Sequence, residues 1–448
     1  MFRVASADEI LWDVEEEHLD EAEFLIEVWS RALDMPHYDL RDLARGPERR
    51  AIAHLDALAV GGPEVAARLL QPLLGDPEAP PFRVAAALGA LLMGGDWRVL
   101  ESLDRGGVSD SRVSALTAVV ALAPLSAFEG SLAAALEEAD GGRSVYLLNM
   151  LAARGEDTGP GVVAGLSSSD PALARTAAEA VVRSDPLVHV ASLEGAMRSS
   201  DSRVRRAAIR TGLVWGFHPA WELATRLAES PLEEPESLVW VASLGDGRHW
   251  PLLTSALDRA ETRGVAIWAL GFSGRRHAIE LCLPYLEDEK LAGVAAEAIA
   301  AIVGVDTSDS VIWKPVSSES PDADVAAGSE LPALADDDLE ADLTPTVEDR
   351  LPAPNAAALR ALCEARCAEL SPDLRYLAGR VMTHACVIDA LHSGSLRRRH
   401  TLAFELAVRT RGAQLVPTRA AAARQRAVLE AVTELPRLDF GASFEQMP

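Results

Sequence analysis

The sequence predicts an all-α fold, an α-solenoid of about eight stacked helix pairs with further helices at both ends. Three observations support this prediction. Alanine-rich apolar blocks recur from about residue 76 to residue 304, and each is followed by a second, weaker amphipathic stretch. No segment shows the alternating pattern of a strand over a useful length. A single pair of short helices cannot bury both of its apolar faces, so stacked pairs are needed to form a continuous core.

The repeat is clearest in the first helix of each unit, as in RVAAALGALL (83–92), RVRRAAIRTGL (203–213) and RGVAIWALG (263–271). The steps between aligned apolar anchors are 29, 32, 28, 31, 34, 27 and 29 residues. A unit of about 30 residues holds two helices of roughly 10–12 residues and two short turns. The anchors are Val84, Val113, Val145, Leu173, Val204, Leu238, Val265 and Val294.

The second helices are expected within 187–198, 219–228, 249–258 and 275–286. An aspartate precedes three of the first helices, where its carboxylate can accept hydrogen bonds from free backbone N–H groups. We therefore predict N-caps at Asp110, Asp170 and Asp201.

Both ends of the chain are predicted to be helical as well. Apolar residues spaced by three and four predict helices over 8–33, 47–60 and 63–74, which together form an N-terminal cap, 1–75, on the repeats of 76–304. Four more helices are expected over 355–370, 374–391, 396–410 and 418–434, within a C-terminal module of 351–435 that a tail, 436–448, follows.

An acidic linker, 305–350, separates the repeats from the C-terminal module. It carries 13 acidic residues against Lys314 and Arg350, so we expect it to be partly disordered. The module reverses this charge, with 12 arginines and 7 acids between 351 and 435. We hypothesise that the module folds back on the repeats, with Arg397, Arg398 and Arg399 facing acidic residues.

The composition restricts the class of protein. The chain has 448 residues and a formal net charge of −26, a sign that repels nucleic-acid phosphate. The segment from Met1 to Glu17 lacks the basic start of a signal peptide, and no apolar run is long enough to span a membrane. The four cysteines need not form disulfides in a chain of this length. We expect a soluble cytoplasmic protein with reduced thiols.

The block at 263–304 resembles HEAT-like repeats of the phycobilin-lyase type. The matching parts are an alanine-rich first helix that ends at Ala269-Leu270-Gly271, then Gly274, a second helix with Leu281 and Tyr285-Leu286, Asp288, and Val294 at the start of the next helix. The resemblance covers about 76–304 and implies an architecture, but it does not imply one activity, because this repeat serves lyases, chaperones and scaffolds.

A second resemblance involves the two ends of the chain. The segments 15–58, 351–355 (LPAPN), 375–380 (RYLAGR), 391–408 and 419–425 look like an uncharacterised proteobacterial family with HEAT-like repeats. That family is often encoded near type VI secretion genes, particularly in myxobacteria. The resemblance implies an accessory role in secretion, and the family has no established catalytic or binding residues to carry over.

Two groups of residues suggest a metal, although in each case we favour another interpretation. Cys363, Cys367, His384 and Cys386 are possible zinc ligands, but the first two lie on an apolar helix face, where cysteine is usually a small buried hydrophobe. The acidic run DDDLEAD (336–342) could hold calcium, but it lacks the glycine and glutamate of an EF-hand loop, which favours a solvated acidic segment.

Three histidines of the N-terminal helices, His18, His37 and His54, could converge as ligands, although buried or capping histidines are commoner. We therefore expect neither a metal nor another cofactor.

Several residues are candidates for binding. Arg397, Arg398 and Arg399 could bind phosphate, but we favour a solvated turn paired to acids. Aromatic residues gather in the middle repeats, where most are expected in the core and one or two on the inner side would be binding hot spots. The candidates among them are Trp215, Trp221, Trp240 and Trp250.

The sequence shows no phosphate-binding loop, nucleophile elbow or zinc-protease motif. We therefore expect a non-enzymatic protein-binding scaffold, adaptor or chaperone, with a type VI secretion component or effector as one candidate partner and the second helices forming the inner surface. One alternative is a lyase-like HEAT enzyme. Another is a nucleic-acid-binding HEAT-like protein, for which arginines occur at 203–210, 275–276 and 397–399.

Overall fold

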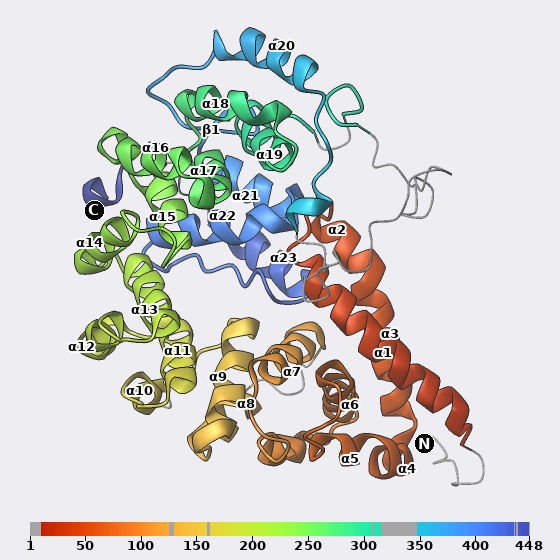
Figure 1. Ribbon diagram of the computed structural model, residues 1–448. Helices are drawn as coiled ribbons and strands as arrows, with labels where there is room; N and C mark the ends of the chain where they lie inside the picture. Colours follow the sequence, from red (N-terminus) through yellow and green to blue (C-terminus); the bar gives the residue numbers. More distant parts are fainter. Residues whose placement is uncertain are drawn as a thin grey trace, which may run out of the picture. The chain divides into compact units, whose positions relative to one another are not determined.

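The computed structural model describes residues 10–124, 130–158, 162–306, 309–314, 347–433, 435 and 438–447. These residues form an all-α structure with one small hairpin, and most helices pack on their neighbours in sequence (Figure 1). The predicted all-α fold with sequential helix packing is thus confirmed. The chain divides into two compact units, Met1–Leu253 with Thr383–Pro448, and Thr254–Met382. Within the described residues, no helix is both long enough and apolar enough to cross a membrane.

The first unit begins with the helices expected as a cap. Helix α1 buries Leu19, Ala22, Ile26 and Trp29 on one face and keeps its acidic residues on the other. The predicted second helix begins in a π-helical turn that contains Gly46 and Pro47, and the predicted third helix is interrupted by another. The elements are α1 Trp12–Ala32, α2 Leu40–Leu43, a π-helix Ala44–Glu48, α3 Arg49–Val60, α4 Gly62–Val65, a π-helix Ala66–Leu70, and α5 Gln71–Leu74.

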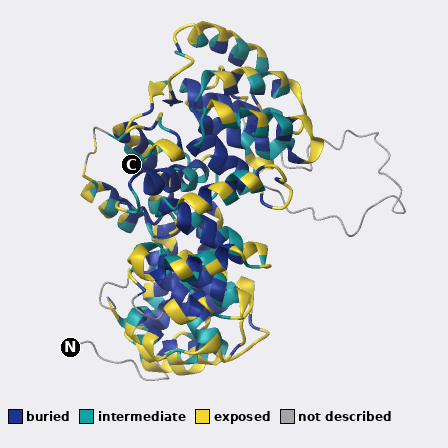
Figure 2. Cartoon of the chain, turned by 90° about the vertical axis from the view of Figure 1, so that its left-hand side faces the viewer, coloured by how far each residue is buried: buried dark blue, intermediate teal, exposed yellow. Residues whose placement is uncertain are grey.

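The predicted first helices follow as one continuous row. Within this row α6 contacts α7, α7 contacts α9, α9 contacts α11, and α11 contacts α13. Each helix contains its predicted anchor. The alanine-rich faces allow the backbones of neighbouring helices to approach closely. Figure 2 shows buried residues along these helices and exposed ones on the connecting turns. The helices are α6 Pro81–Met93, α7 Asp110–Leu122, α9 Gly141–Arg154, α11 Pro171–Ala180, α13 Ser202–Val214 and α15 Glu236–Leu244.

Two of the three predicted N-caps are confirmed. The carboxylate of Asp170 accepts a hydrogen bond from the backbone N–H of Ala172, and that of Asp201 accepts from Arg203 and Val204. The prediction for Asp110 is wrong by one residue. Ser109 caps α7 through its hydroxyl, and Asp110 is the first residue of the helix.

The second elements of the repeats vary more than the first, from short 3-10 segments to the 12-residue helix α12. They have solvent on one side, so fewer apolar residues are needed to hold them. They comprise 3-10 turns at Trp97–Ser102, Val181–Arg183 and Gly247–His249, and helices α8 Ser131–Glu137, α10 Val162–Leu166, α12 Pro186–Met197, α14 His218–Leu227 and α16 Trp250–Asp258.

The end of the chain completes the first unit. Helix α22 packs against α13 and α15, while α21 and α23 both contact α2. The packing of these helices on the repeats agrees with the fold-back hypothesis, although 347–382 belongs to the second unit. The elements are α21 His384–Ser393, α22 Leu396–Arg409, α23 Ala422–Ala431 and a 3-10 turn Phe444–Gln446.

The second unit contains the last predicted repeats and a hairpin. Its elements are α17 Ala260–Ser273, α18 Arg276–Cys282, a 3-10 turn Leu283–Glu287, α19 Ala292–Val303, a 3-10 turn Glu348–Arg350, α20 Ala356–Cys367, β1 Tyr376–Leu377 and β2 Arg380–Val381. Tyr376 pairs with Val381 across the antiparallel hairpin. The described ends of the acidic segment meet in an isolated bridge between Trp313 and Pro354. The proposed calcium segment, 336–342, lies outside the described residues.

The predicted helix 374–391 is wrong in its first half, because the hairpin replaces it. Ala378 and Gly379 both have positive φ, 52° and 74°, as a two-residue turn of type I′ requires. The backbone N–H of Ala378 donates to the carbonyl of Ala301, 2.8 Å away, and Arg375 donates to the carbonyls of Phe272 and Ser273. The hairpin thus satisfies carbonyls at the ends of α19 and α17, which a local sequence pattern cannot show.

Candidate functional site

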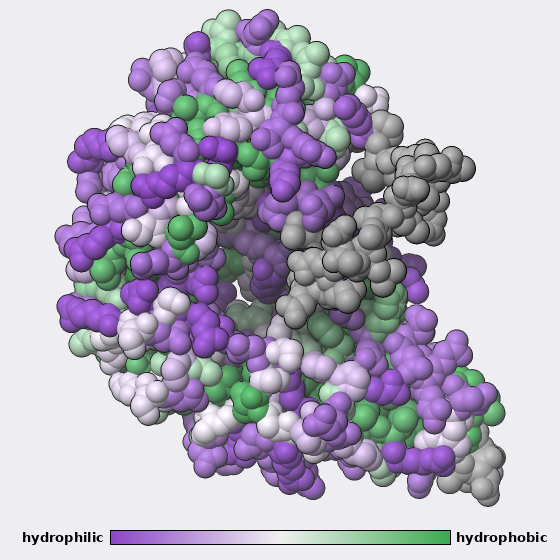
Figure 3. All heavy atoms as spheres, viewed as in Figure 1, coloured by the Kyte–Doolittle hydropathy of each residue, from purple (hydrophilic) through white to green (hydrophobic). Residues whose placement is uncertain are grey.

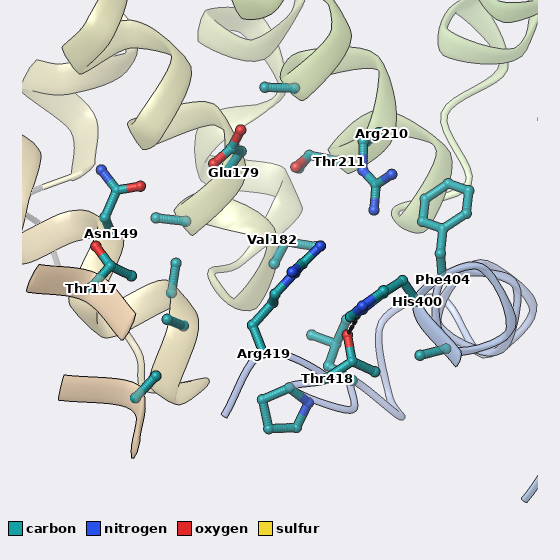
Figure 4. Close-up of a pocket in the computed structure, with 18 of the residues that line it drawn as sticks. Thr117, Asn149, Glu179, Val182, Arg210, Thr211, His400, Phe404, Thr418 and Arg419 are labelled. Atoms are coloured by element: carbon teal, nitrogen blue, oxygen red, sulfur yellow. Dashed lines mark hydrogen bonds between the residues drawn. The ribbon is translucent and has the colours of Figure 1, made fainter. Parts of the chain in front are cut away.

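A cavity of about 930 Å³ lies in the first unit. Helices α7, α9, α11 and α13 form one wall, and α1, α22 and residues 415–419 form the other (Figure 4). In the space-filling view the surface is hollowed at this place (Figure 3). We expected the second helices to form the inner surface, and this is wrong here, because the first helices line the cavity.

Residue size and helical periodicity explain the first wall. On α7 the cavity-facing residues fall at spacings of three and four, as do Arg203, Arg206 and Arg210 on α13. Alanines stand between these polar side chains, so space remains in front of the helices. These alanines are Ala118, Ala121, Ala152, Ala153, Ala180 and Ala207.

The lining is basic, although the chain as a whole carries a net charge of −26. Six arginines line the cavity, against three acidic residues, Asp110, Glu179 and Glu236. The arginines are Arg175, Arg183, Arg203, Arg206, Arg210 and Arg419. Five of the six have a carboxylate partner within 3.6 Å, among them Glu234 and Asp34 outside the lining, so within the described residues the surplus positive charge lies at Arg183, and the other arginines offer N–H donors that their partners do not use.

The guanidinium groups of α13 are held loosely by acids. Arg210 lies 3.0 Å from the Glu236 carboxylate and over the Phe404 ring, whose centroid is 4.7 Å away. Arg206 lies 3.6 Å from Glu234, a contact too long for a hydrogen bond. These arginine side chains keep between 38% and 50% of their surface exposed, so their other N–H groups remain accessible from the cavity.

Glu179 lies opposite His400 and Arg419 in the cavity (Figure 4). Its side chain is 43% accessible and lies 3.5 Å from Arg175. Burial among the surrounding protein atoms raises the pKa of this carboxyl, while the charges of Arg175, Arg210 and Arg206 act to lower it. One carboxylate therefore already lies within the influence of three guanidinium groups.

Arg183 differs from the other lining arginines. Its Nη2 donates to the Leu415 carbonyl over 3.3 Å, and within the described residues no carboxylate lies at ion-pair distance. Burial lowers the pKa of Arg183, the charge of Arg424 lowers it further, and Asp157 counters through space. Arg183 is thus a half-buried cation without a direct counter-ion in the described part of the chain.

The second wall is fixed by a set of contacts around Asp34. Arg419 donates to both carboxylate oxygens of Asp34, each over 2.7 Å. His400 Nε2 donates to the Leu33 carbonyl over 3.0 Å, so its Nδ1 accepts from the Thr418 hydroxyl over 2.8 Å. Burial lowers the pKa of His400, which favours this neutral form of the ring. These contacts hold residues 415–419 on α1.

The predicted binding residues lie elsewhere in the first unit. Trp221 and Trp240 are buried, whereas Trp215 and Trp250 are half-buried. Trp221 stacks on Phe444 at 5.3 Å, and the Trp215 indole N–H donates to the Val182 carbonyl. None of the four is among the described residues that line the cavity.

The expectation of a solvated turn at Arg397, Arg398 and Arg399 is wrong for the last two, which are buried in α22. Arg399 donates through Nε to the Leu391 carbonyl over 2.6 Å, and burial lowers its pKa to about 10. A backbone carbonyl thus takes the place of the acidic partner that we expected, and Asp39 acts on this charge through space.

The possible zinc ligands fall in different units, Cys363 and Cys367 in the second, and His384 and Cys386 in the first. Burial raises the pKa of the Cys363 thiol to about 12, and His384 Nε2 lies 2.7 Å from the Gln414 side-chain oxygen. In the described ranges, no three His, Cys, Asp or Glu side chains gather in a way that could hold a metal.

Two of the N-terminal histidines do meet. His18 and His54 lie with their Nδ1 atoms 3.0 Å apart, joining α1 to α3, while the His37 ring contacts Tyr38. One ring nitrogen donates this hydrogen bond and the other accepts it, so at most one of the two rings carries a charge.

The sequence signalled only part of the cavity. Arg203, Arg206 and Arg210 form a cluster in the sequence, which we considered under the nucleic-acid-binding alternative. Glu179 and Arg183 were not predicted, although Arg175, Glu179 and Arg183 recur at four-residue spacing, because that spacing is also typical of a solvated helix face. Comparisons with known proteins found no matching family model, and no similar curated protein or solved structure. The functional argument therefore rests on the geometry of the cavity.

Proposed function

We propose that this chain is a non-enzymatic protein-binding scaffold or adaptor, and that it holds its partner in the cavity of the first unit. One observation carries the proposal. Successive first helices, α7, α9, α11 and α13, contribute side chains to one open cavity, as in solenoids that bind partners along a row of repeats.

The chemistry of the lining supports a protein partner over a small apolar ligand. Small-molecule pockets have similar volumes, about 300–1,000 Å³, but are lined mainly by apolar and aromatic side chains with few polar groups. Apolar side chains, most of them alanine and valine, also line this cavity, but six arginines and three acids stand among them, and Phe404 and Trp29 are the large aromatic residues of the described lining. Arginine is enriched at protein interfaces, where its planar group makes several hydrogen bonds at once.

The resemblance of the chain ends to the secretion-associated family adds a setting for this proposal. It makes a type VI secretion component or effector one candidate partner. This part of the proposal is an association, because the resemblance identifies no contact residue.

Affinity capture with cavity-blocking variants tests the proposal. Ser114 and Ala153 line the cavity and are not buried, so Ser114→Trp and Ala153→Trp place a large ring in it without entering the core. Ala191→Trp, on the exposed side of α12, is the matched control. Proteins captured from the native cells are identified by mass spectrometry, and binding is then measured with the purified partner.

We expect the wild type and Ala191→Trp to bind the partner equally, and both cavity-blocking variants to lose it while keeping the wild-type melting temperature. A partner that binds the cavity-blocked proteins as tightly as the wild type would show that the cavity is not the binding surface.

A further inference from the structure

The cavity contains a position that is already occupied by a carboxylate. Glu179 lies 3.5 Å from Arg175 and is close enough to Arg206 and Arg210 for their charges to act on it. Arg206 and Arg210 also contact Glu234 and Glu236, but each guanidinium carries five N–H groups and binds carboxylates in a planar fork, so donors remain. Glu179 therefore shows how a second carboxylate can be bound at the same place.

A different part of the wall offers a second position. The guanidinium of Arg183 is half-buried and, in the described part of the chain, makes one long hydrogen bond, to the Leu415 carbonyl. A buried charge without a counter-ion is unfavourable, and an anion that enters the cavity relieves this cost. Arg183 follows α11 in a 3-10 turn, while Arg206 and Arg210 belong to α13, so the two positions lie on successive segments of the wall.

We infer that the cavity binds an acidic peptide segment of the partner, one of whose carboxylates contacts Arg183 and another the cluster of Arg175, Arg206 and Arg210. This inference rests on the proposed function and specifies the chemistry of the partner. Two separated carboxylate positions require a chain that bears several acids, which an acidic protein segment supplies.

The surroundings favour an acidic peptide over nucleic acid. Nucleic-acid binding needs a continuous run of phosphate contacts, and its strength comes from the release of many counter-ions. Here Asp110, Glu179 and Glu236 interrupt the arginines, and the chain carries a net charge of −26. A short acidic peptide reaches the arginines of the cavity without bringing a long polyanion near the acidic remainder of the surface.

The first test uses a fluorescein-labelled peptide of ten glutamates, with a peptide of ten glutamines as the neutral control. Fluorescence anisotropy with the full-length chain at 50 mM and 300 mM salt measures binding. We expect the glutamate peptide to bind and to weaken as salt rises, and the glutamine peptide not to bind.

Arginine variants locate the bound peptide. Arg183→Gln and Arg206→Gln are each expected to weaken glutamate-peptide binding by about tenfold, since each removes charge-assisted hydrogen bonds. Arg198→Gln is the matched control, because Arg198 ends α12, is 76% exposed and lies outside the cavity lining. It changes the net charge by the same amount and should leave binding within twofold of the wild type.

Glu179→Gln gives a result of the opposite sign. It removes the resident carboxylate that competes for Arg175, Arg206 and Arg210, so glutamate-peptide binding should strengthen by about threefold to tenfold. Its control is Glu194→Gln on α12, which makes the same change in net charge beside Arg198 and should have no such effect.

Several results would overturn the inference. These are no binding of the glutamate peptide at 50 mM salt, equal losses in Arg183→Gln and Arg198→Gln, weaker binding in Glu179→Gln, and tighter binding of a ten-nucleotide oligothymidine than of the peptide. Failure of the proposed function looks different, because the cavity-blocked variants then bind the captured partner as tightly as the wild type. If the cavity-blocked variants lose the captured partner while Arg183→Gln and Arg206→Gln retain it, the proposed function stands and the acidic segment is excluded.

Discussion

Two arginine clusters of similar appearance in the sequence have different surroundings in the structure. Arg203, Arg206 and Arg210 line the cavity and keep between 38% and 50% of their side chains exposed. Arg398, Arg399 and Arg409, on α22, are buried. The first group faces space that a partner can enter, and the second is used inside the protein.

The difference lies in what each guanidinium contacts. Arg409 donates to Glu405 over 2.7 Å and to the carbonyls of Ser243, Asp439 and Ala442, so it connects α22 to α15 and to the end of the chain. Arg206 approaches one carboxylate, at 3.6 Å. An arginine with all its donors used in the interior stabilises the fold, whereas one with donors left over is available for a ligand.

The largest effect on stability is expected for Arg409→Met. This change removes the Arg409 guanidinium from the buried Glu405 carboxylate and removes donors from three carbonyls. Breaking a buried ion pair from one side costs about 3–5 kcal/mol. Chemical denaturation of the variant measures this loss, and the double variant Arg409→Met/Glu405→Leu should recover part of it. A loss below about 1 kcal/mol would mean that the pair contributes no more than an exposed one.

A smaller effect is expected for Arg399→Met, although Arg399 is equally buried. The hydrogen bond of its charged group to the Leu391 carbonyl is worth about 1.5–3 kcal/mol, but methionine also removes the cost of burying a charge that has no direct acidic partner among the described residues. We expect a net loss of about 1–2 kcal/mol by denaturation. A loss as large as that of Arg409→Met would show that an acidic partner does not account for the difference between the two residues.

An ion pair of intermediate exposure allows a pH test. Asp34 and Arg419 are 39% and 51% exposed, so their pair should contribute about 0–1 kcal/mol at pH 7. Burial raises the pKa of Asp34, but hydrogen bonds from His400 and Arg419, with the Arg419 charge, lower it overall. The folded pKa therefore lies below the unfolded value of about 3.9, and the contribution is present above that pH and is lost as pH falls below it.

The variant Asp34→Asn isolates this contribution. Below the pH range in which the neighbouring His400 titrates, the variant's difference in unfolding free energy from the wild type should shrink as the pH falls below about 3.9. Denaturation curves of both proteins across this range measure the difference. A difference that grows at acid pH would contradict the assigned direction of the pKa shift.

The smallest effect on stability is expected for Arg206→Gln in the cavity. Its contact with Glu234 is 3.6 Å long and its side chain is 38% exposed, and glutamine keeps an N–H donor beside the buried Glu234 carboxylate, so the free energy of unfolding should change by less than about 1 kcal/mol. The same variant is expected to weaken acidic-peptide binding, so Arg206 would separate binding from stability. A loss of stability as large as that of Arg399→Met would show that Arg206, like the arginines of α22, stabilises the fold.

The sequence alone determined the class of the fold and much of its order. The predicted anchors all lie in helices of the structure, and Val84, Val145, Val204 and Leu238 are buried. Two of the predicted aspartate caps are in place as well. These features could be predicted because periodicity and capping are local, and each depends on residues within a few positions of one another.

The tertiary structure alone decided which face of the repeats is hollow, where 376–381 turns back as a hairpin, and which arginines are buried. The second wall of the cavity depends on Arg419 meeting Asp34, residues separated by 385 positions. Likewise, Arg399 and Arg206 have similar neighbours in the sequence but different partners in space. Long-range contacts of this kind leave no periodic trace in one sequence, so the function of a charged residue follows from the elements that pack against it.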